Sequence, residues 1–196
     1  MNAGHWLKSE LEDDDEQSEP EEGEASEHQE KVTEFFRRYH AVVQPLRDDC
    51  RALRVPAQVN DQRARRVYVR AVFAEIEATL DMYAQFLLLI HGEDVPPAER
   101  MLLEEKEAAI DADGSVKIRR LKCGLNSRLR FIFKMVDNYN GWDPEPKFTD
   151  NRWEDLQASI KIRDRLTHPK LAQQLEVSDD ELAAVSRAQS WFDAQT

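Results

Sequence analysis

Apolar residues recur at intervals of three and four along most of the chain, which is the spacing of one face of an α-helix. Residues 61–91 are the most regular segment, with apolar positions at Val69, Phe73, Ile76, Leu80, Tyr83, Leu87 and Ile90. A similar pattern predicts a helix over residues 31–53, which Pro45 should kink or break. Pro96 and Pro97 open a short helix over residues 97–110.

The second half of the chain continues the helical pattern. Residues 115–139 are expected to form a helix whose buried face carries Ile118, Leu121, Leu125, Leu129, Ile132 and Val136. Another helix begins near Asp150 and ends before Pro169, and Ser178 to Glu181 form a capping box that opens a last one. No strand-like alternation is present, so the sequence predicts an all-α, up-and-down helical bundle of about five to six helices.

Charge divides the chain into two parts. Residues 1–30 hold twelve acidic residues against one Lys, and lack the apolar positions needed for a core, which predicts a disordered acidic tail. Residues 31–196 form the predicted helical bundle domain. The tail carries −11 of the total charge of −12, so the domain is nearly neutral and the overall acidity does not exclude a nucleic-acid partner.

The composition favours a protein without cofactors, metals or disulfides. The two cysteines, Cys50 and Cys123, have neither metal-ligand spacing nor a disulfide framework, which indicates a reducing compartment. No signal peptide is recognisable, and the longest apolar run, residues 86–90, is too short to span a membrane. We therefore expect a cytoplasmic protein with no membrane association.

One face of the helix predicted over residues 115–139 is entirely basic. No acidic residue occurs between Asp113 and Asp137. A solvated surface is the usual explanation of a charge run, but a run of one sign also suits contact with phosphates. The predicted RNA-binding residues from this run are Arg119, Arg120, Lys122, Arg128 and Arg130.

The helix that ends before Pro169 carries the chemistry of greatest interest. Its apolar stripe of Trp153, Leu156 and Ile160 continues into Arg163, where folding alone would favour an aliphatic residue. Asp164 and His168 are four residues apart and lie beside that stripe. Pro169 ends the helix at His168, so the imidazole is expected to point into a cleft.

The end of this helix carries Arg163, the polar Asp164 and then His168, with four residues between the Arg and the His. In an all-helical chain, this arrangement resembles the defining motif of the HEPN superfamily. The resemblance implies metal-independent RNA cleavage at a composite site between two subunits. It assigns His168 to proton transfer, Arg163 to the phosphate and Asp164 to orienting either of them. Arg165 is a second choice for phosphate contact. A toxin or defence system, with an inhibitory protein partner, is a further expectation.

One departure concerns regulation. Some HEPN toxins carry a modified Tyr two residues after the motif His, whereas Lys170 stands there in this chain.

Ile162 and Leu166 give the motif helix a second apolar face, which predicts a homodimer. The alternative function is a non-catalytic dimerisation or partner-binding module, in which Arg163 and Asp164 form a structural pair and His168 only ends a helix.

Overall fold

The computed structural model describes residues 22–59, 61–141, 148, 149 and 151–196. Within these residues the chain forms six α-helices, one short 3-10 helix and a two-stranded sheet. In chain order they are α2 (Glu22–Gln58), α3 (Gln62–His91), α4 (Pro97–Leu103), β1 (Lys106–Ile110), β2 (Val116–Arg120), α5 (Leu125–Tyr139), α6 (Asn151–Thr167), η3 (Ala172–Leu175) and α7 (Asp179–Asp193). The predicted all-α helical bundle is confirmed.

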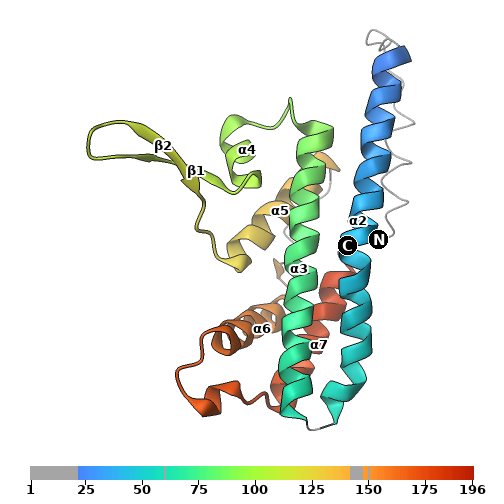
Figure 1. Ribbon diagram of the computed structural model, residues 1–196, viewed down its shortest axis with the longest axis vertical. Helices are drawn as coiled ribbons and strands as arrows, with labels where there is room; N and C mark the ends of the chain where they lie inside the picture. The colour runs from blue at the N-terminus through green and yellow to red at the C-terminus, as the bar shows by residue number, and fades with distance from the viewer. Residues whose placement is uncertain (1–21, 60, 142–147, 150) are drawn as a thin grey trace.

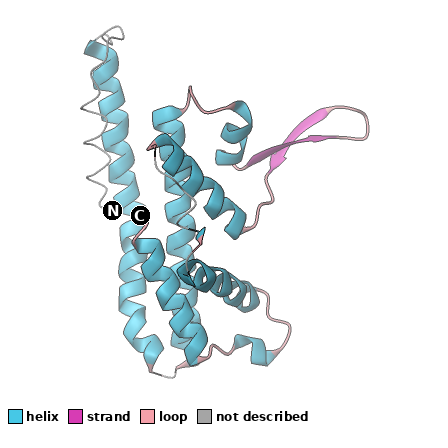
Figure 2. Cartoon of the chain, turned by 180° about the vertical axis from the view of Figure 1, so that it is seen from behind, coloured by secondary structure: helices cyan, strands magenta, loops and turns pink. Residues whose placement is uncertain are grey.

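Helix α3 is the central element of the bundle. It runs alongside α2, as Figures 1 and 2 both show, and also contacts α5, α6 and α7. Most of the apolar stripe predicted for it, from Val69 to Leu87, belongs to the main core, together with large aromatic residues of α5 and α7 such as Phe133, Trp191 and Phe192. No helix in the described residues combines the length and the apolar composition needed to cross a membrane.

Two helix starts follow the sequence prediction closely. The carboxylate of Asp61 accepts a hydrogen bond of 2.8 Å from the backbone N–H of Arg63 at the start of α3. The Ser178 hydroxyl accepts from the Glu181 N–H at 3.2 Å, and the Glu181 carboxylate accepts in return from the Ser178 N–H at 3.0 Å. Both caps satisfy backbone donors that a helix leaves free in its first turn, so they fix where α3 and α7 begin.

Helix α2 differs from the predicted helix over residues 31–53 at its start, at Pro45 and at its end, which is Gln58. It begins at Glu22, so residues 22–30 are helical and do not belong to a disordered tail; residues 1–21 lie outside the described part. An ion pair of 2.7 Å between Glu27 and Lys31 supports this first part of the helix. The helix also continues through Pro45, where a break was considered. Packing against α3 along its length offsets the hydrogen bond that a proline removes.

The largest error of the sequence analysis concerns residues 106–124. They were expected to complete one helix and begin the next, but residues 106–120 form an antiparallel hairpin in which Ala108 pairs with Ile118 and Ile110 with Val116. Figures 1 and 2 show the hairpin projecting from the bundle. Ile118, predicted to be buried, is 58% exposed. The part of the predicted helix from Leu125 onward is confirmed as α5, with Leu129, Ile132 and Val136 buried.

The turn between the two strands explains why the hairpin forms. Gly114 has a φ of +81°, a conformation that residues with a side chain rarely adopt. The Asp113 carboxylate accepts hydrogen bonds from the backbone N–H and the hydroxyl of Ser115, at 3.0 and 2.6 Å. These are local turn interactions that compete with a helix. Val116 and Ile118, both β-branched, then favour a strand over a helix.

Candidate functional site

The motif helix ends as the sequence predicted. Helix α6 closes at Thr167, whose hydroxyl donates to the carbonyl oxygen of Arg163 at 2.8 Å. The backbone N–H of His168 donates to the carbonyl oxygen of Asp164 at 3.0 Å, and Pro169 then prevents another helical turn. The His168 side chain is exposed at this end of α6.

The Arg163 guanidinium is held by two carboxylates. Its Nη1 donates to Asp164 Oδ1 at 2.9 Å, and its Nη2 pairs with Glu77 Oε1 of α3. The exposed fractions of the three side chains are 31% for Arg163, 56% for Asp164 and 38% for Glu77. Partial solvent exposure screens these ion pairs, so their main effect is to fix the orientation of the guanidinium between α3 and α6.

Two further arginines of α3 donate to backbone carbonyls, one at the end of α6 and one at the end of η3. Arg70 Nη2 donates to the carbonyl oxygen of Leu166 at 3.3 Å, and Arg66 Nη1 donates to that of Leu175 at 3.3 Å. Both carbonyls lie at C-terminal ends of helical segments, where a cation is favourable. Arg70 therefore brings a second guanidinium to the last turn of the motif helix.

Glu77, Arg66 and Arg70 were not predicted from the sequence. Glu77 is 86 residues from Arg163, and Arg70 is 96 residues from Leu166. The only available signal is their spacing, since residues 66, 70 and 77 fall on one side of a helix. That spacing does not reveal which element the side faces.

His168 is separate from the other two motif residues. Within the described residues, no hydrogen bond or ion pair joins its imidazole to Arg163 or Asp164. Asp164 instead binds the guanidinium of Arg163. The structure thus brings together Arg163, Asp164 and Glu77, with the imidazole of His168 exposed one helical turn beyond.

The basic residues predicted for RNA contact do not form one helix face. Arg119 and Arg120 lie on β2, Lys122 lies in the connection to α5, and Arg128 and Arg130 lie on α5. The prediction of a single basic helix is therefore wrong, because the hairpin and the break at Gly124 separate its members.

Most of these cations have partners within the chain. Arg119 pairs with Asp111, and Arg120 with Glu105 at 3.0 Å. Arg128 pairs with Asp81 and Glu105.

Of the three remaining predicted contacts, Arg130 and Arg165 also have partners. Arg130 lies over the rings of Phe148 and Trp153, at 4.9 and 5.2 Å from their centroids. Arg165 donates to both carboxylate oxygens of Glu181 at 2.9 Å. The run of one sign in the sequence thus becomes, for the most part, a set of paired charges, which weakens the argument for phosphate binding.

The second apolar face predicted for the motif helix is covered by the chain itself. Ile162 and Leu166 are 6% and 1% exposed and belong to the same core as Trp153 and Leu156. The sequence-based reason for expecting a dimer through this face therefore does not hold, because the face is already buried in one subunit.

A second polar cluster lies where α2, α3 and α7 meet. The Glu75 carboxylate, 1% exposed, accepts hydrogen bonds from Arg47 Nε and Gln189 Nε2, both at 3.1 Å. The Tyr68 hydroxyl donates to Gln189 Oε1 at 2.8 Å. Burial and the neighbouring Glu75 raise the pKa of Asp193 to about 6. Burial likewise raises the pKa of the Cys50 thiol well above its usual value.

Among the described residues, no group of three or more His, Cys, Asp or Glu is arranged to hold a metal ion. Comparisons with known proteins add no family: no family model matches the chain, and no curated protein or solved structure is significantly similar to it.

Proposed function

We propose that the protein is a metal-independent endoribonuclease of HEPN type, acting through Arg163 and His168 at the end of α6. The observation that carries the proposal is the arrangement at this helix end. A guanidinium fixed by Glu77 and Asp164 lies one turn before an exposed imidazole, and Arg70 approaches the same turn. These are the groups that cleavage of RNA by its own 2′-hydroxyl requires.

In this mechanism His168 transfers protons. An imidazole can accept a proton at one ring nitrogen and donate one from the other, so His168 can take the proton from the attacking 2′-hydroxyl or give one to the leaving 5′-oxygen. Both steps are needed in one turnover, and a second copy of His168 from a partner subunit would supply the second group. The dimer is part of the proposal, although its contact surface must be other than the buried face of α6.

Arg163 is assigned to the phosphate. A guanidinium has five N–H donors, and the two contacts with Glu77 and Asp164 leave others for phosphate oxygens. The two carboxylates keep its plane fixed before substrate arrives, which reduces the reorganisation needed in the transition state. Glu77 is accordingly a positioning residue, and Arg70 is a second source of positive charge.

The test is cleavage of a fluorescently labelled single-stranded RNA by the full chain in the presence of EDTA. We expect products ending in a cyclic phosphate or a 3′-phosphate, and no cleavage of the matching DNA, which lacks the nucleophile. His168→Ala and Arg163→Ala should each lower the rate about a hundredfold or more. Arg163→Lys should not restore it, because an ammonium lacks the fork geometry.

Lys161→Ala is the matched control, since it removes an exposed cation from the same helix without touching Arg163 or His168. Its rate should stay close to that of the unchanged protein. Intact RNA after incubation with folded protein, or equal rates for the His168→Ala variant and the unchanged protein, would rule out the nuclease.

One observation favours a second function, the partner-binding module. Both Glu77 and Asp164 neutralise Arg163, as expected of a structural ion pair. In that case Arg163→Ala would lower the melting temperature, whereas His168→Ala would leave the melting temperature unchanged. RNA would stay intact with the unchanged protein and with both variants. A toxin or defence role and an inhibitory protein partner belong to the nuclease proposal and rest on the sequence resemblance, and the proposed cytoplasmic location rests on the two cysteines and the short apolar run.

A further inference from the structure

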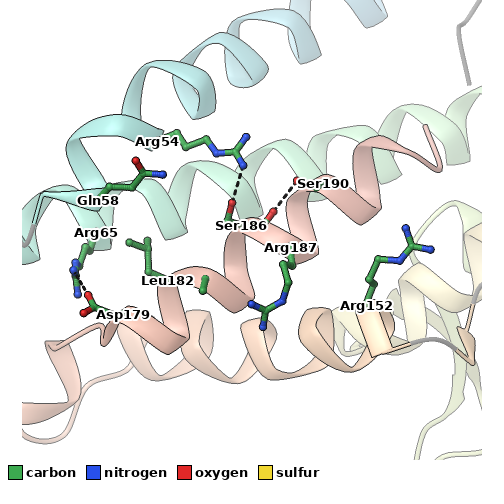
Figure 3. A pocket seen from close by; sticks show the side chains of 10 residues that line it. Arg54, Gln58, Arg65, Arg152, Asp179, Leu182, Ser186, Arg187 and Ser190 are labelled. Atoms are coloured by element: carbon green, nitrogen blue, oxygen red, sulfur yellow. Dashed lines mark hydrogen bonds and ion pairs between the residues drawn. The ribbon is translucent and has the colours of Figure 1, made fainter.

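A pocket of about 540 Å³ lies between the C-terminal end of α2, the start of α6 and one side of α7 (Figure 3). Four arginines line it, together with one carboxylate, that of Asp179. They are Arg54, Arg65, Arg152 and Arg187. This excess of positive charge occurs in a chain whose net charge is −12, so it is a local feature and not a consequence of composition.

The first of these arginines, Arg65, forms part of the wall. It is 3% exposed, and its guanidinium donates to the carbonyl oxygens of Ala57 at 3.2 Å and Val177 at 2.8 Å while pairing with Asp179. With its donors used in this way, Arg65 contributes charge to the pocket and little direct contact.

Arg54 differs from Arg65 in its solvent exposure and in its hydrogen-bond partner. Its side chain is exposed, and Nη2 donates to the hydroxyl oxygen of Ser186 at 3.0 Å. A hydroxyl is neutral, so this bond orients the guanidinium without cancelling its charge. In the described part of the chain no carboxylate forms an ion pair with Arg54. Its remaining donors are therefore available to an anion in the pocket.

The opposite side of the pocket adds two serine hydroxyls, of which that of Ser190 donates to the carbonyl oxygen of Ser186 at 3.0 Å. In Figure 3 the hydroxyls of Ser186 and Ser190 lie between the side chains of Arg54 and Arg152, which come from different helices. Arg187 is fixed by two hydrogen bonds of 2.7 Å to Asp155 of α6, with 56% of its side chain still exposed. Residues with guanidinium and hydroxyl groups from three helices thus line one space.

We propose that this pocket binds the phosphate group of a small phosphorylated molecule about the size of a mononucleotide. Guanidinium forks and the Ser186 hydroxyl around one space suit the several oxygens of a phosphate dianion. The volume lies within the range of about 300–1,000 Å³ that is usual for small-molecule sites. Leu182 and Ala183 supply apolar surface, and Gln58 supplies an amide, for the organic part of the ligand. The proposal is independent of RNA cleavage.

The test is isothermal titration calorimetry of the full chain at fixed ionic strength with adenosine 5′-monophosphate, ribose 5-phosphate, inorganic phosphate and adenosine. We expect the three phosphates to bind and adenosine to bind at least tenfold more weakly than its monophosphate. Arg54→Gln should weaken phosphate binding about tenfold or more, the effect of losing one charge-assisted contact. Ser186→Ala should weaken it less, because it releases Arg54 without removing its charge.

Arg51→Gln is the matched control: it removes an exposed arginine one turn earlier on α2 that does not line this pocket. Its affinity should stay within about twofold of the unchanged protein. If Arg54→Gln does not fold by circular dichroism, Arg187→Gln replaces it. Equal affinity for adenosine and its monophosphate would overturn the proposal, as would an equal loss in the Arg51→Gln control or no binding of any phosphate at millimolar concentration. Stronger binding of the nucleotide than of inorganic phosphate would support it and identify the organic part.

Discussion

Replacing Arg65 with Met tests how the bundle is closed at the junction of α2, α3 and α7. Arg65 is a buried charge, 3% exposed, and it contacts one residue from each side of this junction: Ala57 near the end of α2 and Val177 just before α7. Met has a similar length and no charge, so the change removes the hydrogen bonds while leaving most of the volume filled. The expected result is a large loss of stability.

The magnitude follows from the contacts that are lost. Two hydrogen bonds from a charged donor to buried carbonyl oxygens contribute roughly 1.5–3 kcal/mol each. Met recovers part of this, because the guanidinium no longer has to be removed from water. We therefore expect a loss of about 3–5 kcal/mol in the free energy of unfolding, a substantial share of the ~5–15 kcal/mol usual for a domain.

The assay is urea unfolding followed by circular dichroism, with Asp179→Asn as the control. The Asp179 side chain is 89% exposed, so its ion pair with Arg65 should contribute less than about 1 kcal/mol. The two variants separate the carbonyl contacts from the ion pair. A loss below about 1 kcal/mol for Arg65→Met, or equal losses for both variants, would refute the assignment of stability to the carbonyl contacts.

Two further predictions concern stability. The pKa of Asp193 is raised from 3.8 to about 6 in the folded protein, so the folded state holds this proton more tightly than the unfolded state. The stability that this group contributes should therefore be full below pH 3.8 and be lost as the pH rises through 6. Subtracting the pH profile of stability of Asp193→Asn from that of the unchanged protein should give this falling curve, and a flat difference would contradict the prediction. Ile118→Ala on the exposed hairpin should change the free energy of unfolding by less than about 0.5 kcal/mol, whereas Ile132→Ala in the core should lower it by about 2–5 kcal/mol. Urea unfolding measures both. A comparable loss at both positions would mean that Ile118 is buried.

The sequence by itself determined the helical class and several helix limits, because those signals are local. The apolar spacing of α3, its start near Asp61, the capping box at Ser178 and the stop at Pro169 each depend on residues within one or two turns. The motif residues Arg163 and Asp164 were likewise found together because they are adjacent. His168 was correctly placed at the helix end, since the residue before a proline disfavours the helical conformation.

The hairpin could not be predicted from the same kind of signal. Ile118, Leu121 and Leu125 fit a helical spacing with Leu129, so the apolar pattern favoured one long helix. The turn at Gly114 and the pairing of Ala108 with Ile118 decided otherwise. A short apolar run is compatible with either structure, and the choice depends on whether a partner strand is available.

Only the tertiary structure decided which charges meet. Glu77 reaches Arg163 across 86 residues of sequence, and Arg54 reaches Ser186 across 132. Ion pairing acts over a few ångströms between groups that the fold brings together, so the sequence reveals that a charge is present but not what it faces. For this reason the basic run was predicted to be a phosphate-binding face, whereas the pocket around Arg54 could not be predicted from the sequence.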